Sequence, residues 1–445
     1  MSNFPSTTNN NKSGDWTGYQ KILFRFAFIY FVLQVIPLEG DYYKLLFSAQ
    51  WLHFHFYDLL LLTRYYPFWG LPGFSSWLVI IPIALAGALA WTYFDKGATR
   101  DYNKLYYWLR VLLRYRLAAG VIAFGLIKLF PMQIPYPSLS NFHTTYGQFL
   151  PWKIYYSTIG IIPWYESFLG GVEVVAGLLL FNRNTVTFGT GILVGFLGNV
   201  LAANFAYDLG EQVYITYLFV IALFLFANDI PRLYSLLIQQ RFTIAEKFSP
   251  FFSTRATKAR IVLKTAFVAF VLLFGISSYS NYKQDPYLLP ATPGLTGSEG
   301  FYDVKEFSLN NKTIPYSLTD SSRWQNVIFE KWTTLSIKTA QPIKIDETKS
   351  VAFHNNDVDR TYEETGVGER WYYSYKADTA QHTLWLYNKN PSYKNDSFLL
   401  HYNQPEPSTI LLTGINSHGD SVNTVLHKVV KNYLFTVGRR QPVKL

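Results

Sequence analysis

The chain has 445 residues, of which 49% are hydrophobic and 18% aromatic, whereas 15% carry charge. Soluble globular domains usually carry charge on about a quarter of their residues, so this composition excludes an ordinary soluble protein and favours a large membrane-embedded part. The chain contains no cysteine, which excludes disulfides, thiolate nucleophiles and Cys-ligated metal clusters.

The net charge of +10 does not indicate a nucleic-acid partner. The basic excess lies before Tyr282, in short loops between apolar runs, whereas Lys and Arg nearly balance Asp and Glu in the rest of the chain. This distribution is the positive-inside pattern of membrane proteins and not a DNA-binding face. We therefore expect the lipid bilayer, and no nucleic acid, as a partner.

Composition divides the chain into four parts. Residues 1–20 are predicted to be a flexible cytoplasmic N-terminus without a cleavable-signal pattern. Residues 21–281 are predicted to form a transmembrane domain, and 282–297 a linker rich in proline and glycine. Residues 298–445 are predicted to form an extracytoplasmic β-rich domain.

Seven apolar runs approach the ~20 residues that are needed to cross a hydrocarbon core of ~30 Å. In chain order they are Ile22–Leu38, Trp77–Phe94, Tyr115–Phe130, Ser167–Phe181, Val186–Ala203, Val213–Ala227 and Ile261–Ser278. We therefore expect an α-helical polytopic bundle of about seven transmembrane helices.

The basic residues of the loops orient this bundle with its N-terminus in the cytoplasm. In that orientation the inner segments carry the basic stretches at 96–116 and 232–264, while the outer loops carry only Lys44, Arg64 and Lys153. An odd number of helices then places the C-terminal domain outside. Two long outer loops, 39–76 and 131–166, are rich in aromatic residues and proline, which is typical of interfacial or re-entrant segments.

Beyond Asn281 the hydrophobic pattern changes from helical to alternating. Short runs of β-branched and aromatic residues, separated by Asn, Gly and Asp, predict strands. These runs lie at 326–329, 335–338, 383–387, 398–402 and 409–413. Several short strands at close spacing predict an antiparallel β barrel or sandwich.

Ionisable and amide side chains within or beside the predicted spans are the candidate site, because a charge inside a span costs at least ~2.5–3.5 kcal/mol on insertion scales. We expect Lys128 and Glu173 to approach as an ion pair in the outer half of the membrane. The pair either fixes helix packing or belongs to an outward-opening polar pocket. The other candidates for lining that pocket are Gln133, Asn199, Asn204 and Asp208, the last two on one helical face at i,i+4 spacing.

Two further features of the spans have structural interpretations. Arg25 lies about one turn inside the first predicted helix and is expected to snorkel to the cytoplasmic headgroups. Small residues let transmembrane helices approach closely, so the fourth and fifth predicted spans are expected to pack against each other. The glycines concerned are Gly170, Gly171, Gly177, Gly189, Gly191, Gly195 and Gly198.

His53 and His55, with Asp58 nearby, are the weak candidates for a metal site. Residues at i and i+2 share a face of an extended segment, and would diverge on a helix. No third histidine is close in sequence, and no zinc signature is present. We therefore predict interfacial packing here and no metal site.

Three segments carry a family resemblance: KILFRFAFIYFVLQVIP, AAGVIAFGLIKLFPMQIPYP and YESFLGGVEVVAGLLLFNRNTVTFGTGILVGFLGNVLAANFAYDLG. They resemble the DoxX-like family of bacterial integral membrane proteins, over about residues 20–240 and most specifically over 120–210. The tail resembles the extracytoplasmic extension of longer members through SRWQNVIFEKW, HTLWLYNK and ILLTGINSHGDS.

This resemblance implies a bacterial inner-membrane protein with its C-terminal domain in the periplasm. Family members are tied to quinone-linked oxidation, so a quinone is the cofactor that the resemblance implies, bound by a membrane subunit of a redox system with a protein partner. Lys128, Glu173, Asn199, Asn204 and Asp208 fall in the matching motifs, without an established catalytic role. The alternative is a non-enzymatic scaffold whose β-domain binds a partner or an envelope ligand; transport of a small solute is a third hypothesis.

Overall fold

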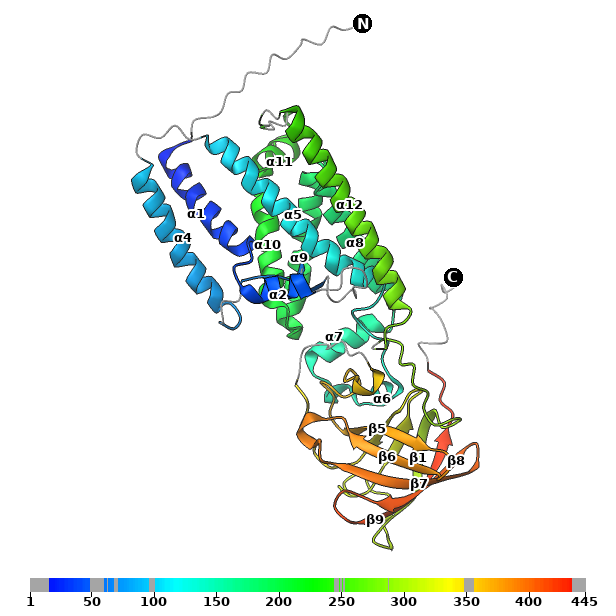
Figure 1. Cartoon of the computed structure of the whole chain (residues 1–445). Helices are drawn as coiled ribbons and strands as arrows, with labels where there is room; N and C mark the ends of the chain where they lie inside the picture. Colours follow the sequence, from blue (N-terminus) through cyan, green and yellow to red (C-terminus); the bar gives the residue numbers. More distant parts are fainter. Residues whose placement is uncertain are drawn as a thin grey trace. The chain divides into compact units, whose positions relative to one another are not determined.

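The computed structural model describes residues 16–48, 60–61, 63–67, 71–95, 101–243, 248, 250, 253–286, 288–347 and 356–433. The chain forms two compact units, one of Met1–Phe130 with Ser167–Asn281 and the other of Pro131–Glu166 with Tyr282–Leu445 (Figure 1). This division differs from the expected domains in one segment. Residues 131–166, expected as an outer loop of the transmembrane domain, group with the C-terminal residues.

The first unit is helical. Its helices are α1 (Gly18–Val35), α2 (Gly40–Ser48), α4 (Ser75–Phe94), α5 (Tyr102–Leu129), α8 (Pro163–Leu179), α9 (Val186–Tyr207), α10 (Gln212–Ala227), α11 (Ile230–Leu237) and α12 (Thr254–Tyr282). Each of the seven predicted spans corresponds to one of these helices, namely α1, α4, α5, α8, α9, α10 and α12.

Among the described residues, α4, α9 and α12 are long and apolar enough to cross a membrane, and up to six spans result if each bent helix pair is one span. The bent pairs are α1 with α2 at 45°, α10 with α11 at 60°, and α8 with α7 (Pro151–Gly160) at 94°. Large apolar side chains stay exposed on α4 and α12, such as Leu78 at 72% and Leu263 at 70%. Lipid would cover these faces, and the chain is a multi-pass membrane protein.

Glycines of α8 bring this helix against α5. A Cβ at Gly170 would lie 2.2 Å from the Leu129 nitrogen and 2.4 Å from the Gly125 oxygen, so no other residue fits there without a shift. A Cβ at Gly177 would lie 2.5 Å from the Ile122 side chain. The small residues of α8 therefore allow backbone contact with α5, whereas the sequence predicted that they face α9.

The glycines of α9 face more than one neighbour. Gly189 lies against Leu179 at the end of α8, as predicted. Gly191 and Gly198 face phenylalanine rings of α10, which the sequence did not predict. A run of small residues thus predicts a close helix contact but does not identify the neighbouring helix.

Arg25 does not snorkel outward, and that prediction is wrong. Its guanidinium lies 2.6 Å from Asp95 Oδ2, and its side chain is 7% exposed. It also donates to Tyr102 Oη at 2.9 Å and to Thr92 Oγ1 at 2.7 Å. The end of α4 and the start of α5 supply these partners, so protein groups satisfy the charge.

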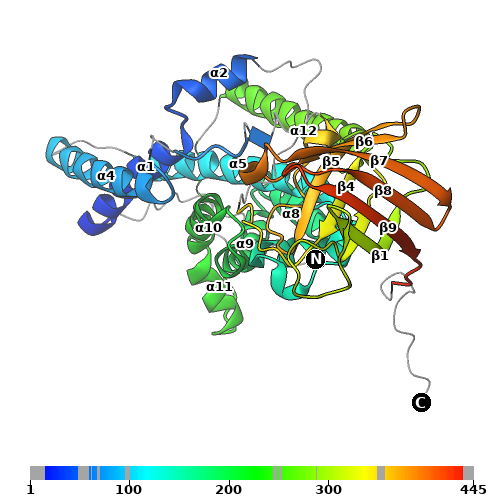
Figure 2. The ribbon, with the colours of Figure 1, turned by 90° about the horizontal axis from the view of Figure 1, so that it is seen from below.

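The second unit contains an antiparallel β barrel, which confirms the predicted class and selects the barrel over the sandwich (Figures 1 and 2). Its strands are β1 (Gly300–Leu309), β2 (Lys312–Thr313), β3 (Asn326–Phe329), β4 (Thr334–Lys338), β5 (Arg370–Asp378), β6 (Thr383–Asn388), β7 (Ser397–Glu406), β8 (Thr409–Ile415) and β9 (Ser421–Val429). The order is β1-β3-β4-β5-β6-β7-β8-β9, and β9 pairs back with β1 from Phe301↔Val429 to Leu309↔Val422. The short β2 extends β1 as a hairpin.

Alternate residues of the strands fill the barrel with apolar side chains, as closure of an eight-strand sheet requires. Those that are at most 2% exposed are Tyr302, Phe307, Val327, Phe329, Leu335, Ile337, Tyr375, Leu384, Leu386, Leu400, Ile410, Leu412, Val422 and Leu426. Because the sheet closes on itself, these strands leave no open edge for pairing with another chain.

Segment 131–166 is part of this second unit because its backbone pairs with the long connection between β4 and β5. Phe149 forms a β-bridge with Val367. Leu150 N donates to Gly366 O at 2.9 Å, and Gly368 N donates to Gln148 O at 2.7 Å. The segment contains α6 (Leu139–Phe142), η1 (Tyr146–Gln148) and α7, so it is a folded arm of the second unit.

The close contact of α5 and α8 gives a stability prediction with a matched control. Gly170→Ala should lower the free energy of unfolding by about 1–3 kcal/mol, because the added methyl has no room. At Gly171 the nearest atom to an added Cβ lies 3.9 Å away. Gly171→Ala should therefore be neutral or slightly stabilising, since alanine favours a helix by ~0.5–1 kcal/mol.

The measurement is thermal denaturation of both variants of the full chain in one detergent. Equal melting temperatures for the two variants would contradict the close contact between α5 and α8.

Candidate functional site

Lys128 of α5 and Glu173 of α8 form the ion pair that the sequence predicts. Lys128 Nζ lies 2.7 Å from Glu173 Oε1, and the two side chains are 13% and 3% exposed. The Lys128 ammonium also lies 5.8 Å from the centre of the Phe124 ring and 5.9 Å from that of Phe196. The pair is thus enclosed by apolar rings, where each charge depends on the other.

One oxygen of this pair is left without a hydrogen bond. Glu173 Oε2 is buried and accepts no hydrogen bond from any residue that the structure describes. A buried acceptor without a partner is costly, and a water or a ligand donor commonly satisfies it. The cavities described below are lined by other residues.

The other predicted pocket residues of the bundle make their contacts elsewhere. Asn204 is buried at the end of α9, where its Oδ1 accepts from Glu211 N at 3.2 Å. Asp208 follows the helix with a φ of 54° and accepts from Gln212 Nε2 at 3.0 Å. These two residues shape the turn into α10. The predicted common helical face is wrong, because α9 ends before Asp208. Asn199 is exposed on α9.

Gln133 lies in the arm 131–166, and its backbone nitrogen donates to Glu166 Oε1 at 3.2 Å. It belongs to the second unit. The histidines His53 and His55 and the nearby Asp58 lie outside the described residues. Within the described part of the chain, no three His, Asp or Glu side chains are placed to bind a metal ion.

Sequence reasoning missed the partners of two other cations of the helical unit. Arg64 pairs with Glu211, joining the segment before α4 to the start of α10. Arg116 donates to Tyr65 O and lies 5.2 Å from the centre of the Tyr217 ring. The sequence assigned Arg116 to a basic loop, whereas α5 starts at Tyr102 and carries it into the bundle. A predicted helix that extended back through the basic stretch would have placed Arg116 in the bundle.

The barrel has an open mouth with a cavity of about 440 Å³. The mouth lies at the end where β1 finishes and β9 begins. Aromatic side chains form its wall, and uncharged polar and acidic side chains form its rim. The aromatic residues are Phe307, Trp324, Trp371, Tyr373, Tyr393 and Phe398, and the rim includes Thr339, Gln341, Asn395, Asp396, Asn416, Ser417, His418 and Asp420.

Hydrogen bonds hold the rim in place. Asp396 accepts from Tyr373 Oη at 2.8 Å, from Asn388 Nδ2 at 2.8 Å and from Ser417 Oγ. Burial and the neighbouring Asp396 raise the pKa of Tyr373 well above its ordinary value, so its hydroxyl stays a donor. Hydrogen bonds from Asn310 and Asn416 lower the pKa of Asp420, which stays ionised. The mouth is therefore a preorganised, mildly acidic surface.

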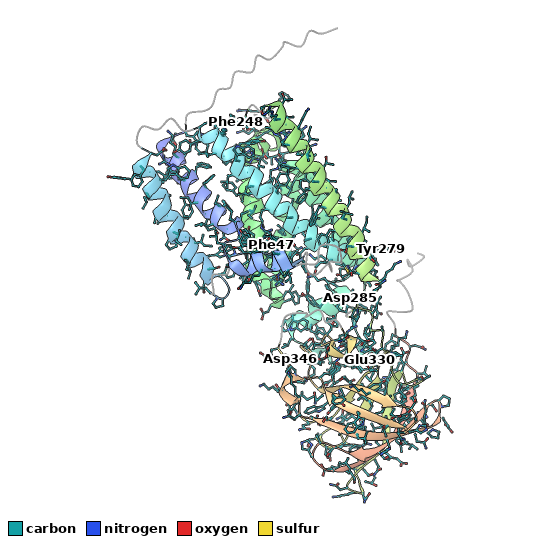
Figure 3. All side chains as sticks on the ribbon, in the orientation of Figure 1. Phe47, Phe248, Tyr279, Asp285, Glu330 and Asp346 are labelled. Atoms are coloured by element: carbon teal, nitrogen blue, oxygen red, sulfur yellow. The ribbon has the colours of Figure 1, made fainter. Side chains whose placement is uncertain are left out.

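A second group of polar residues lies buried where the arm 131–166 meets the β4–β5 connection. Lys153 of α7 is fully buried, donates to Tyr362 O, and lies 3.5 Å from the centre of the Tyr362 ring. Arg360 lies 2.7 Å from Glu363 Oε1. Glu330, labelled in Figure 3, accepts from the Ser140 nitrogen at 2.8 Å and so binds the start of α6.

Burial shifts the pKa values of several of these buried polar residues. It raises the pKa of Glu364 to about 8, against the attraction of Lys389, and it raises the pKa of Glu330. It lowers the pKa of Lys153 to about 7, against the attraction of Glu363 and Glu364. Neither carboxylate oxygen of Glu364 accepts a hydrogen bond from another described residue. The group is a structural core with titratable members rather than an open site.

No protein-family model, no curated protein and no solved structure matches this chain. Function therefore has to be inferred from the residues and their geometry, and membership of the DoxX-like family stays a proposal.

Glu364 should make the stability of the second unit depend on pH. Its pKa is raised from 4.5 to about 8, so between these pH values the folded state keeps a proton that the unfolded state releases. The free energy of unfolding therefore falls as the pH rises through this window, by at most about 1.4 kcal/mol for each pKa unit. Glu330 acts in the same direction. Lys153 has the opposite effect: it makes the free energy of unfolding rise with pH, but only above its folded pKa of about 7.

We expect Glu364→Gln to reduce the fall in melting temperature between pH 5 and pH 7, measured on the full chain by tryptophan fluorescence. Glu299→Gln is the control, because Glu299 is an exposed glutamate of the same unit. A slope in Glu364→Gln as steep as that of the wild type would contradict the raised pKa.

Proposed function

We propose that this protein is a DoxX-like protein of the bacterial inner membrane, whose C-terminal barrel binds a hydroxyl-rich envelope ligand, such as a glycan, at its mouth. The observation that carries this proposal is the mouth cavity of about 440 Å³, with aromatic rings on its wall and amide, hydroxyl and carboxylate groups on its rim. It develops the scaffold hypothesis, in which the β-domain recognises a ligand and performs no chemistry.

The chemistry of the lining selects the ligand class. A sugar ring presents apolar C–H faces and hydroxyl edges, and aromatic rings such as Trp371 and Tyr393 can pack on those faces. Asp396, Asn416 and His418 offer acceptors and donors for the hydroxyl edges. Among the described lining residues there is no Lys or Arg, so a polyanion would find no counter-charge. The volume lies within the ~300–1,000 Å³ that small-molecule sites occupy.

The distribution of basic residues supports a periplasmic barrel. Figure 3 labels Phe248 and Tyr279 at opposite ends of the helical unit. Arg183 and Lys264 contact the backbone near the Phe248 end, where Arg183 donates to Phe248 O at 2.9 Å. The positive-inside rule assigns that end to the cytoplasm. The chain enters the barrel after the other end of α12, which favours the opposite compartment.

Two substitutions at the mouth test the proposal on the full chain in detergent. Trp371→Ala removes an aromatic wall, and His418→Ala removes an exposed rim group that costs the fold little. Neutral oligosaccharides would be screened on an array, and the best binder would be titrated by calorimetry. We expect each substitution to weaken its binding at least tenfold.

Trp385→Ala is the matched control, because Trp385 is 47% exposed on β6 and does not line the mouth. The proposal fails if no oligosaccharide binds the wild type, or if the mouth variants bind as tightly as the control does.

A second candidate function, membrane subunit of a quinone-linked redox system, is favoured by the unsatisfied Glu173 Oε2. A quinone needs a hydrogen-bond donor to its carbonyl oxygen, and a group that gives it a proton when it is reduced and takes that proton back when the quinol is oxidised. Lys128 supplies the first and Glu173 the second, and the rings of Phe124 and Phe196 suit an apolar headgroup. The electrons would come from a redox partner, because the sequence has no recognisable haem, flavin or iron–sulfur site.

Native mass spectrometry with lipid extraction tests this candidate. We expect wild-type protein to retain a quinone, and Lys128→Met and Glu173→Gln to lose it. Loss of thermal stability in both variants without any retained quinone would assign the pair a structural role only. Breaking a buried ion pair costs about 3–5 kcal/mol in either case, so the bound molecule, and not the melting temperature, decides.

A further inference from the structure

A cavity of about 570 Å³ opens at the end of the helical unit that contains Phe248. It lies between α5, the start of α9 and the bend from α10 into α11. Four arginines line it, Arg110, Arg114, Arg183 and Arg232, and Asp229 is its one acidic lining residue among those described. Four guanidinium groups therefore face one carboxylate.

The carboxylate does not neutralise this charge. Asp229 Oδ2 lies 3.9 Å from Arg110 and accepts from Thr187 Oγ1 at 2.8 Å. Arg232 makes no hydrogen bond or ion pair within the described part of the chain, and its Nε is a buried donor without a partner. A second cavity of about 350 Å³ shares Arg183 and adds Arg260 and Lys264 to the basic lining.

The remaining arginines are held in position by backbone oxygens. Arg114 Nε donates to Leu180 O at 2.9 Å, just beyond the end of α8, and Arg183 donates to Phe248 O at 2.9 Å. The Leu180 carbonyl fixes the Arg114 guanidinium without adding a counter-charge, and the Phe248 carbonyl helps to hold that of Arg183. The positive-inside rule explains why basic residues lie near this end, but it does not explain why they line one cavity.

The helix α11 indicates the depth of the cavity in the bilayer. It bends by 60° from α10, and its apolar side chains are exposed, with Tyr234 at 53% and Leu237 at 67%. A short helix with an exposed apolar face that turns away from a span is typical of the membrane–water interface. Pro231, Arg232 and Ser235 of this helix line the cavity. Phosphate groups of lipids lie at the same depth.

We propose that this cavity binds a phosphate group. Guanidinium groups bind phosphate oxygens in a bidentate way, and they do so more strongly than neutral donors. Basic pockets between transmembrane helices on the cytoplasmic side are the sites at which anionic lipid headgroups bind. The phosphate is carried either by an anionic phospholipid or by a soluble phosphate ester, and the experiment below distinguishes these two sources.

The test uses the purified, delipidated full chain and native mass spectrometry. Phosphatidylglycerol, phosphatidylcholine and glycerol 3-phosphate are added separately. We expect at least tenfold stronger retention of phosphatidylglycerol than of phosphatidylcholine, whose choline the arginines repel. Retention of glycerol 3-phosphate at equal concentration, and its displacement of phosphatidylglycerol, would identify a soluble ester as the ligand.

Arg232→Gln is the main variant, because Arg232 has no described bond that the fold would lose, and Arg110→Gln is the second. Both should reduce retention of the bound phosphate compound at least tenfold. Lys258→Gln is the control, since it removes one exposed positive charge from α12 outside both cavities. Retention of neither phosphatidylglycerol nor glycerol 3-phosphate would overturn the proposal. So would equal losses in the arginine variants and in Lys258→Gln.

Discussion

The backbone pairing between residues 148–150 and 366–368 decides how this chain is organised. Through it, the arm between α5 and α8 becomes part of the unit that contains the barrel, although more than 200 residues of sequence separate the two paired segments. The chain therefore passes between its two units three times, after Phe130, after Glu166 and after Asn281. The barrel is not an independent tail. Without it, the buried Trp152, Lys153 and Tyr156 of α7 would lose the surface that covers them.

The same pairing explains the buried polar group of the second unit. The arm covers the outer face of β4 and β5, so Ser336 and Tyr372 are buried there although they point away from the barrel interior. Glu330 accepts hydrogen bonds from the backbone nitrogens at the start of α6, and Lys153 donates a hydrogen bond to the carbonyl oxygen of Tyr362. Polar groups that are removed from water need such partners. This unit thus joins its two chain segments with directional bonds as well as with apolar contacts.

In the helical unit, ion pairs connect segments that are distant in sequence. Arg25 meets Asp95, Arg64 meets Glu211, and Lys128 meets Glu173. In the Arg25 and Lys128 pairs, which are largely buried, each charge would be strongly destabilising alone, so each of these two pairs fixes one relative position of two helices. The glycines complete this arrangement by allowing α8 to reach the backbone of α5. The arginine-lined cavity differs from these pairs, because four arginines and one carboxylate, Asp229, stand among its described lining residues.

The sequence alone determined the division into an apolar helical part and a β-rich part, the position of seven helices, and the meeting of Lys128 and Glu173. These features follow from local periodicity, from the length of apolar runs and from the cost of a buried charge, which neighbouring residues are enough to reveal. The tertiary structure decided what depends on distant partners. It alone closed β9 on β1, assigned 131–166 to the barrel unit, gave Arg25 its partner, and assembled the mouth from residues between Phe307 and Val422. Asn204 and Asp208 show the same limit, since their spacing predicted one helical face but the helix ends between them. A local pattern indicates that a buried charge needs a partner, or that a run of small residues allows close packing. Only the packed chain determines which segment lies against these residues.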